Sequence, residues 1–150
     1  MRIGLASIFL ILYSCQTSST TTDVNGPYEP NRSVKKFING FEKAVMTHES
    51  GAIMEYLHED YVKEQHDQFL EERTDQFLNE LFCGNKIDAK GFACIEYTSI
   101  TSIQYFKAER KNGIKWIFFE VSNKDTKVLM DLSIKASKSK LKYGFVGAYG

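Results

Sequence analysis

Two side chains that could do chemistry, His66 and Arg73, lie seven residues apart in a stretch whose pattern predicts a helix. At about 100° per residue, this spacing places both on the apolar side of the helix, within about 60° of Phe77. A buried guanidinium needs an anionic partner, and an unperturbed histidine titrates near neutral pH. The pair is therefore a candidate pocket in which Arg73 holds an anion and His66 moves a proton. The alternative is that Arg73 reaches water at the border of the apolar face and His66 is structural.

The chain has three cysteines, Cys15, Cys83 and Cys94. In an oxidising compartment, Cys83 and Cys94 commonly pair, and closing the short loop between them would stabilise the fold by about 3 kcal/mol. Two cysteines at this spacing, without clustered histidines, do not make a zinc site. We expect no metal and no other cofactor. No nucleophile, phosphate-loop or metal motif identifies an enzyme.

Charge is balanced overall but unevenly distributed along the chain. The 19 basic and 19 acidic residues give a formal net charge of zero, which argues against a nucleic-acid binder. Acidic residues dominate from Glu59 to Glu80, and lysines dominate from Lys124 to Lys142. These are either two solvated faces or, for the acidic stretch, a surface that docks a basic partner.

The N-terminus reads as an export signal. Arg2 precedes an apolar run from Ile3 to Tyr13, which is too short for a membrane span of about twenty residues but typical of a secretory signal. The run ends in LYSC at positions 12–15, which resembles the lipobox of bacterial lipoproteins. The resemblance implies cleavage before Cys15 and attachment of lipid, with acyl chains such as palmitate, to its sulfur. An ordinary secretory signal with a chance cysteine is the alternative.

This N-terminus suggests a division of the chain into three parts. Residues 1–14 are the expected signal peptide, and residues 15–30 are a flexible Ser/Thr-rich linker that begins with the lipidated Cys15. Residues 31–150 are long enough for one domain with its own core. The expected location is the bacterial cell envelope, with the lipid as membrane anchor and the domain on the periplasmic or cell-surface face.

Helical patterns fill the first half of the domain. An amphipathic stripe predicts a helix over 34–48, capped by Asn31 or Ser33, and a short helix follows Ser50. A third and longest helix is predicted over 61–82, with a dry face and a wet, acidic face. The acidic face includes these residues: Glu64, Glu71 and Asp75.

Strand patterns fill the second half. Residues 96–108 and Ile114–Val121 are rich in β-branched and aromatic types, and Lys111-Asn112-Gly113 between them is a hairpin signal. Residues 127–135 alternate between apolar and polar, which indicates an antiparallel sheet with one covered side. The predicted fold class is therefore α+β, with three N-terminal helices packed on a curved antiparallel sheet of about four strands.

The stretch FINGFEKAVMTHESGAIMEYLHEDYV, residues 37–62, resembles the opening of the NTF2-like superfamily with its cystatin-like cone. The resemblance implies a pocket between the long helix and the sheet; relatives include isomerases and dehydratases, but no catalytic motif can be matched here. We therefore expect a lipid-anchored envelope protein that binds a small molecule or a protein partner without catalysis. The alternatives are a lyase or isomerase with a cone pocket at His66 and Arg73, or a structural or protective protein that docks through the acidic face of residues 61–82.

Overall fold

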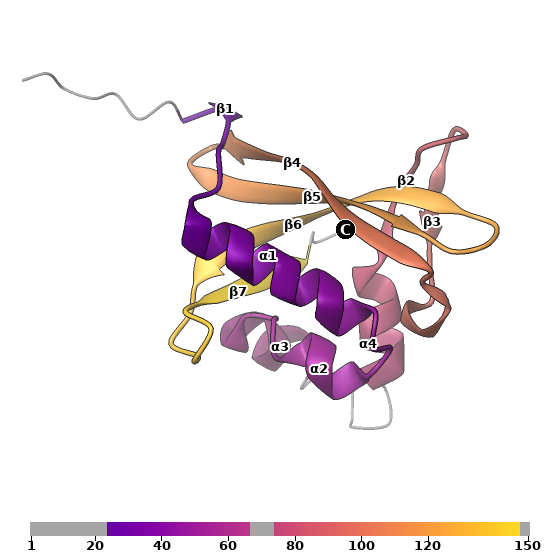
Figure 1. The fold of residues 1–150 in the computed structure, drawn as a ribbon, viewed down its shortest axis with the longest axis horizontal. Helices are drawn as coiled ribbons and strands as arrows, with labels where there is room; N and C mark the ends of the chain where they lie inside the picture. Colours follow the sequence, from indigo (N-terminus) through magenta and orange to yellow (C-terminus); the bar gives the residue numbers. More distant parts are fainter. Residues whose placement is uncertain (1–23, 67–73, 148–150) are drawn as a thin grey trace, which may run out of the picture.

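The computed structural model of the protein describes residues 24–66 and 74–147, and these form an α+β domain (Figure 1). Its helices are α1 (Arg32–Val45), α2 (Ser50–Met54), α3 (Glu59–His66) and α4 (Thr74–Leu81), with a 3-10 turn at Tyr97–Ser99. Its strands are β1 (Gly26–Pro27), β2 (Cys83–Lys86), β3 (Phe92–Cys94), β4 (Ser102–Lys111), β5 (Ile114–Ser122), β6 (Lys127–Ala136) and β7 (Tyr143–Gly147). The expected α+β class is thus confirmed.

The strand number and the element order differ from the sequence-based prediction. All seven strands join one antiparallel sheet in the order β1-β4-β5-β6-β2-β3, and β7 also pairs with β6, whereas about four strands were predicted. The helices are not N-terminal, because β1 precedes α1 and pairs with β4 at Arg110 and Glu109. The additional strands β1, β2 and β3 are only two to four residues long, so no local alternation marks them.

The first helix is close to its prediction. Asn31 caps α1, since its side-chain oxygen accepts a hydrogen bond from the Val34 amide at 2.9 Å. The apolar stripe of α1 then faces the sheet and is buried. It consists of Val34, Phe37, Ile38, Phe41, Ala44 and Val45.

The long third helix predicted over 61–82 is wrong. A continuous helix would hold Tyr61 and Phe77 about 24 Å apart, at 1.5 Å per residue. Their ring centroids lie only 5.5 Å apart, because Tyr61 belongs to α3 and Phe77 belongs to α4, and the two helices pack together. The apolar periodicity continued across two helices and concealed the break between them. Of the expected acidic face, Glu64 lies in α3 and Asp75 lies in α4, so these two do not share one helix face, and Glu71 lies outside the described residues.

The hairpin signal and the alternating strand are confirmed. Asn112 and Gly113 both have positive φ, 52° and 77°, and form the two-residue connection between β4 and β5. In β6, one side is buried, and it consists of Val128, Met130, Leu132 and Ile134.

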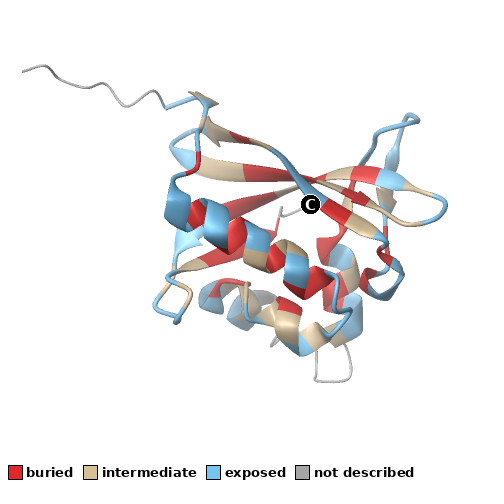
Figure 2. Cartoon of the chain, viewed as in Figure 1, coloured by how far each residue is buried: buried red, intermediate tan, exposed pale blue. Residues whose placement is uncertain are grey.

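Buried residues of α1 and of the central strands, coloured red in Figure 2, pack into one core. Phe41 of α1, Phe119 of β5 and Phe145 of β7 are each 0% exposed, and their ring centroids lie 4.8 to 5.7 Å apart. Phe82 stacks on Phe41 at 6.5 Å. Such packing contributes roughly 1.5–3 kcal/mol per buried side chain. The centre of the described domain is therefore a packed core.

β7 connects the helices to the sheet. β2 and β7 both pair with the same edge of β6. The opposite edge of β7 forms hydrogen bonds with residues 56–58. The Phe145 amide donates to the Tyr56 carbonyl, and the His58 amide donates to the Phe145 carbonyl, both at 2.8 Å. The segment between α2 and α3 is thereby held against the sheet.

Within the described ranges, no helix has the length and hydropathy needed to cross a bilayer.

Candidate anion-binding groove

The pocket expected from the sequence cannot be placed in the described part of the chain. His66 is the last residue of α3, but its side chain and the whole of Arg73 lie outside the described residues. Cys15 and the expected signal peptide also lie outside them. Within the described ranges, no three His, Cys, Asp or Glu side chains are arranged to hold a metal ion.

Cys83 and Cys94 lie opposite each other on the antiparallel strands β2 and β3, and their sulfur atoms are at disulfide-bonding distance. In the chain-entropy model, a cross-link over so short a loop stabilises by about 3 kcal/mol. It fastens a hairpin that pairs with β6 through Asn85 and Lys86 of β2. The pair therefore has a structural place at the sheet edge.

His58, Glu59 and Asp60 form a polar cluster at the start of α3 that serves packing. The His58 ring is buried; its Nε2 lies 3.1 Å from the Ala136 carbonyl, and its Nδ1 accepts the Asp60 amide at 3.2 Å. Glu59 accepts from the Ser137 hydroxyl at 2.7 Å and from the Lys138 amide at 3.1 Å. These bonds fix the turn between β6 and β7 against α3.

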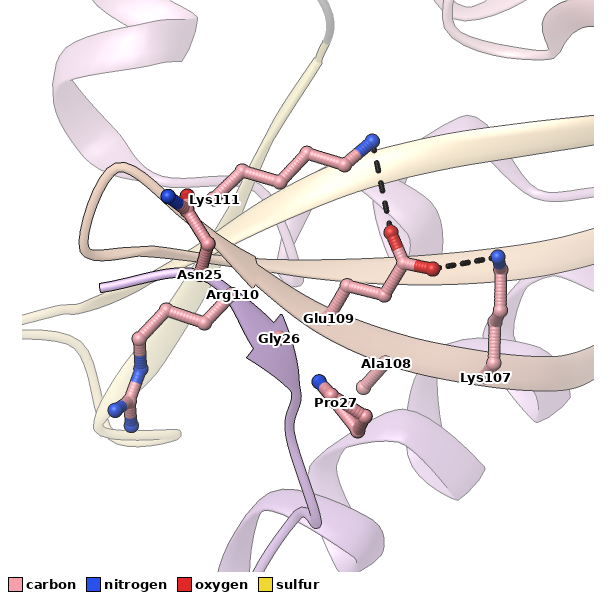
Figure 3. A pocket seen from close by; sticks show the side chains of 8 residues that line it. All are labelled: Asn25, Gly26, Pro27, Lys107, Ala108, Glu109, Arg110 and Lys111. Atoms are coloured by element: carbon pink, nitrogen blue, oxygen red, sulfur yellow. Dashed lines mark hydrogen bonds and ion pairs between the residues drawn. The ribbon is translucent and has the colours of Figure 1, made fainter. Parts of the chain in front are cut away.

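A shallow cavity of about 480 Å³ lies where β1 meets β4 (Figure 3). Its charges are largely paired, because Glu109 accepts from Lys107 at 2.6 Å and lies 3.5 Å from the Lys111 ammonium. The hydrogen bond from Lys107 lowers the pKa of the Glu109 carboxyl. Arg110 points away from this pair in Figure 3, and its guanidinium lies 5.8 Å from the Tyr28 ring centroid. The cavity offers little uncompensated charge to a ligand.

A larger groove, of about 760 Å³, runs between α1 and the β6–β7 turn. Basic side chains line both of its sides. They are Arg32, Lys35, Lys36 and Lys43 from α1, and Lys140 and Lys142 from the turn. None of the described residues that line the groove carries a carboxylate.

Lys35 pairs with Glu29, and the other five of these cations have no ionic partner among the described residues. Three cations, Arg32, Lys35 and Lys36, stand at the start of α1, where acidic residues would suit the positive end of the helix dipole and none is present. The helix end and the cations thus add to the same positive potential, so the groove is suited to an anion.

The floor of the groove is apolar and closely fitted. Phe37 packs against Tyr56 with ring centroids 5.3 Å apart, and Leu141 lies half-buried between the two lysines of the turn. Tyr56 passes directly over Gly40, where any side chain would overlap its hydroxyl. Charged rims over such a floor suit a ligand that carries an anionic group next to carbon-rich surface.

Sequence reasoning missed this groove, although part of the signal was present. Arg32, Lys36, Asn39 and Lys43 follow one another at spacings of four, three and four, which places them along one side of a helix. The lysines at 140 and 142 lie in the basic stretch interpreted as a solvated face. Only the fold shows that this turn lies beside α1.

No family model, curated protein or solved structure matches this chain. The fold and the groove together define an α+β domain with a basic surface groove beside its first helix.

Proposed function

We propose that the protein is a lipid-anchored, non-catalytic binding protein of the bacterial cell envelope, and that its groove binds an anionic ligand or partner. The observation that carries the proposal is that, among the described residues, five of the cations that line the groove have no ionic partner and no carboxylate lines it. Like charges that are crowded together without a counter-charge are unfavourable. These side chains are exposed, so a bound anion could supply that counter-charge. A binding role at the surface is supported further by the packed aromatic core, because apolar side chains fill the interior of the described domain.

The NTF2-like fold and the lipid anchor are parts of the same proposal. The fold is supported by the helices α1 to α4, which pack against one large antiparallel sheet. The anchor is supported by the LYSC sequence at 12–15 after a short apolar run. Acyl chains contribute about 0.8 kcal/mol per buried methylene, and two or more chains hold a protein stably at a bilayer.

The groove is tested with inorganic pyrophosphate as a compact anionic probe. The chain from residue 15 onward, with Cys15→Ser to prevent lipidation, is titrated while amide resonances are followed by NMR. Binding in the groove should shift amides of α1 and of residues 137–142, because charge-assisted hydrogen bonds form there. Replacing Lys36 and Lys140 by Gln should weaken the apparent affinity about tenfold.

The matched control replaces two exposed lysines of the β2–β3 hairpin, Lys86 and Lys90, by Gln. This pair removes the same charge from a remote surface, so it should change the affinity less than twofold. Shifts that are spread evenly over all lysine-bearing surfaces, or equal losses in the two variants, would show that the groove is no specific site.

A further inference from the structure

We propose that the anion bound by the groove is the phosphodiester headgroup of anionic phospholipid, so that the domain lies with this end against the bilayer to which it is tethered. The inference rests on the proposed function, because it uses both the groove and the lipid anchor. Three observations carry it: where the described chain begins, how charge is distributed at that end, and how short the tether is.

The described chain begins at the same end of the molecule as the groove. The Val24 carbonyl accepts from the Gly113 amide at 3.0 Å, which places the first described residue at the β4–β5 turn. Arg32 of α1, the first cation of the groove, lies five positions after Pro27 of β1. Figure 1 shows β1, the first turns of α1, the β4–β5 turn and the β6–β7 turn together at one end.

The same end carries cations beyond those of the groove. Lys111 and Lys115 flank the β4–β5 turn, and the Lys115 ammonium lies 5.1 Å from the Tyr28 ring centroid. Three carboxylates stand nearby and are outnumbered by these cations: Glu29 and Glu109 each pair with a lysine, and Glu59 is hydrogen-bonded to the β6–β7 turn. The net surface at this end is therefore positive although the whole chain is neutral. A chain that binds free small anions needs one pocket, whereas a charged end suits an extended anionic surface.

The tether brings this end close to a bilayer. Val24 lies nine positions after Cys15, and a chain of this length spans about 30 Å at full extension. A short linker of this kind gives the domain an effective concentration near the surface in the millimolar range. Individually weak contacts between lysines and headgroups are then sufficient to orient the domain.

The groove geometry suits phospholipid in particular. Arg32 can form paired hydrogen bonds with a phosphate, and the lysines of both rims add point charges. The apolar floor of Phe37, Tyr56 and Leu141 can contact the glycerol region beneath a headgroup. An acidic protein segment would use the same charges, and the experiment below separates the two.

The experiment measures sedimentation of the chain with vesicles. The chain from residue 15 onward, with Cys15→Ser, is mixed with vesicles of phosphatidylcholine alone or with added phosphatidylglycerol. We expect binding to the anionic vesicles only, and weaker binding as salt is raised. The variant Lys36→Gln/Lys43→Gln/Lys140→Gln should bind at least tenfold more weakly, since a lysine near an anionic surface contributes roughly fivefold.

A control variant, Lys86→Gln/Lys90→Gln/Lys124→Gln, removes the same charge from exposed lysines of the β2–β3 hairpin and the β5–β6 turn, away from the groove. It should lose less than twofold, and equal losses in the two triple variants would overturn the inference. Absence of vesicle binding would also overturn it. If pyrophosphate still shifts the groove amides in that case, the proposed function stands with a soluble anion or acidic protein as ligand. If neither probe binds, both proposals fail.

Discussion

At the scale of single residues, Glu59 shows how one carboxylate holds the β6–β7 turn, which lines the groove. It is exposed, yet hydrogen bonds from Ser137, from its own amide and from Lys138 lower its pKa to about 2. The protonated imidazole of nearby His58, with Nε2 at 4.0 Å, would favour the same charged form. Because Glu59 anchors the start of the turn that carries Lys140 and Lys142, its ionisation also bears on the shape of the groove.

This lowered pKa predicts a pH dependence of stability. The folded carboxylate binds a proton less tightly than the unfolded one, whose pKa is about 4.3, so its contribution is complete above about pH 4.5 and is lost toward about pH 2. Glu59→Gln should therefore lower the urea midpoint at neutral pH, and the difference from the parent chain should shrink as pH falls through this window. A difference that is constant with pH would contradict the assignment.

The control is Glu55→Gln, which alters an exposed glutamate without a side-chain hydrogen bond or ion pair among the described residues. This change should move the midpoint little throughout the same window. The comparison isolates the bonds that Glu59 makes to the turn.

At the scale of elements, the close approach of β7 to the start of α3 determines how sheet and helices fit. A Cβ on Gly144 would stand 2.5 Å from the His58 Cα and 2.8 Å from its amide nitrogen. Both atoms belong to the backbone that β7 holds with two hydrogen bonds, so neither can shift without losing them. The glycine is thus required by the space between two elements.

Gly144→Ala is therefore expected to destabilise the domain by about 1–3 kcal/mol, the usual cost of inserting a methyl group into a tightly packed site. Gly51→Ala provides the matched change, because nothing lies within 4 Å of its added Cβ in α2. Alanine is favoured in helices, so this variant should be neutral or up to about 1 kcal/mol more stable. Urea unfolding of both variants tests the contact, and equal stabilities would refute it.

The elements also show what the sequence could and could not predict. The stripe of α1, the Asn112-Gly113 turn and the alternation of β6 are local patterns, and each was recognised. The separation of α3 from α4 was missed because the apolar residues of the two helices follow a single, uninterrupted helical spacing in the sequence. β2 and β3 were missed because they are only four and three residues long, and because β2 joins the sheet through β6, more than forty residues later in the chain. The groove could be predicted only in part. Its α1 side follows from a local helical pattern, whereas the position of the β6–β7 turn beside α1 depends on the tertiary fold.

At the scale of the whole molecule, the anchor at Cys15 should determine where the protein is found. Cells that express the chain should incorporate labelled palmitate and retain the protein in the membrane fraction. Cys15→Ser should abolish the label and release the protein, because the remaining groove contacts are reversible and salt-sensitive.

A variant with Cys83→Ser and Cys94→Ser serves as the control for this experiment. It retains the cysteine of the LYSC sequence and should still take up the label. Equal labelling and equal fractionation of the parent chain and Cys15→Ser would rule out the lipid anchor.

The position of β7 bears on how the chain acquires its structure. Phe145 sits at the centre of the core, yet it comes from the last strand along the described chain. The helices that it contacts are made about a hundred residues earlier, and at 5–20 residues per second this is a delay of roughly 5–20 seconds. During this interval the aromatic side of α1 has no complete partner. Newly made chains would need protection from premature association until β7 docks and closes the domain in one late, cooperative step.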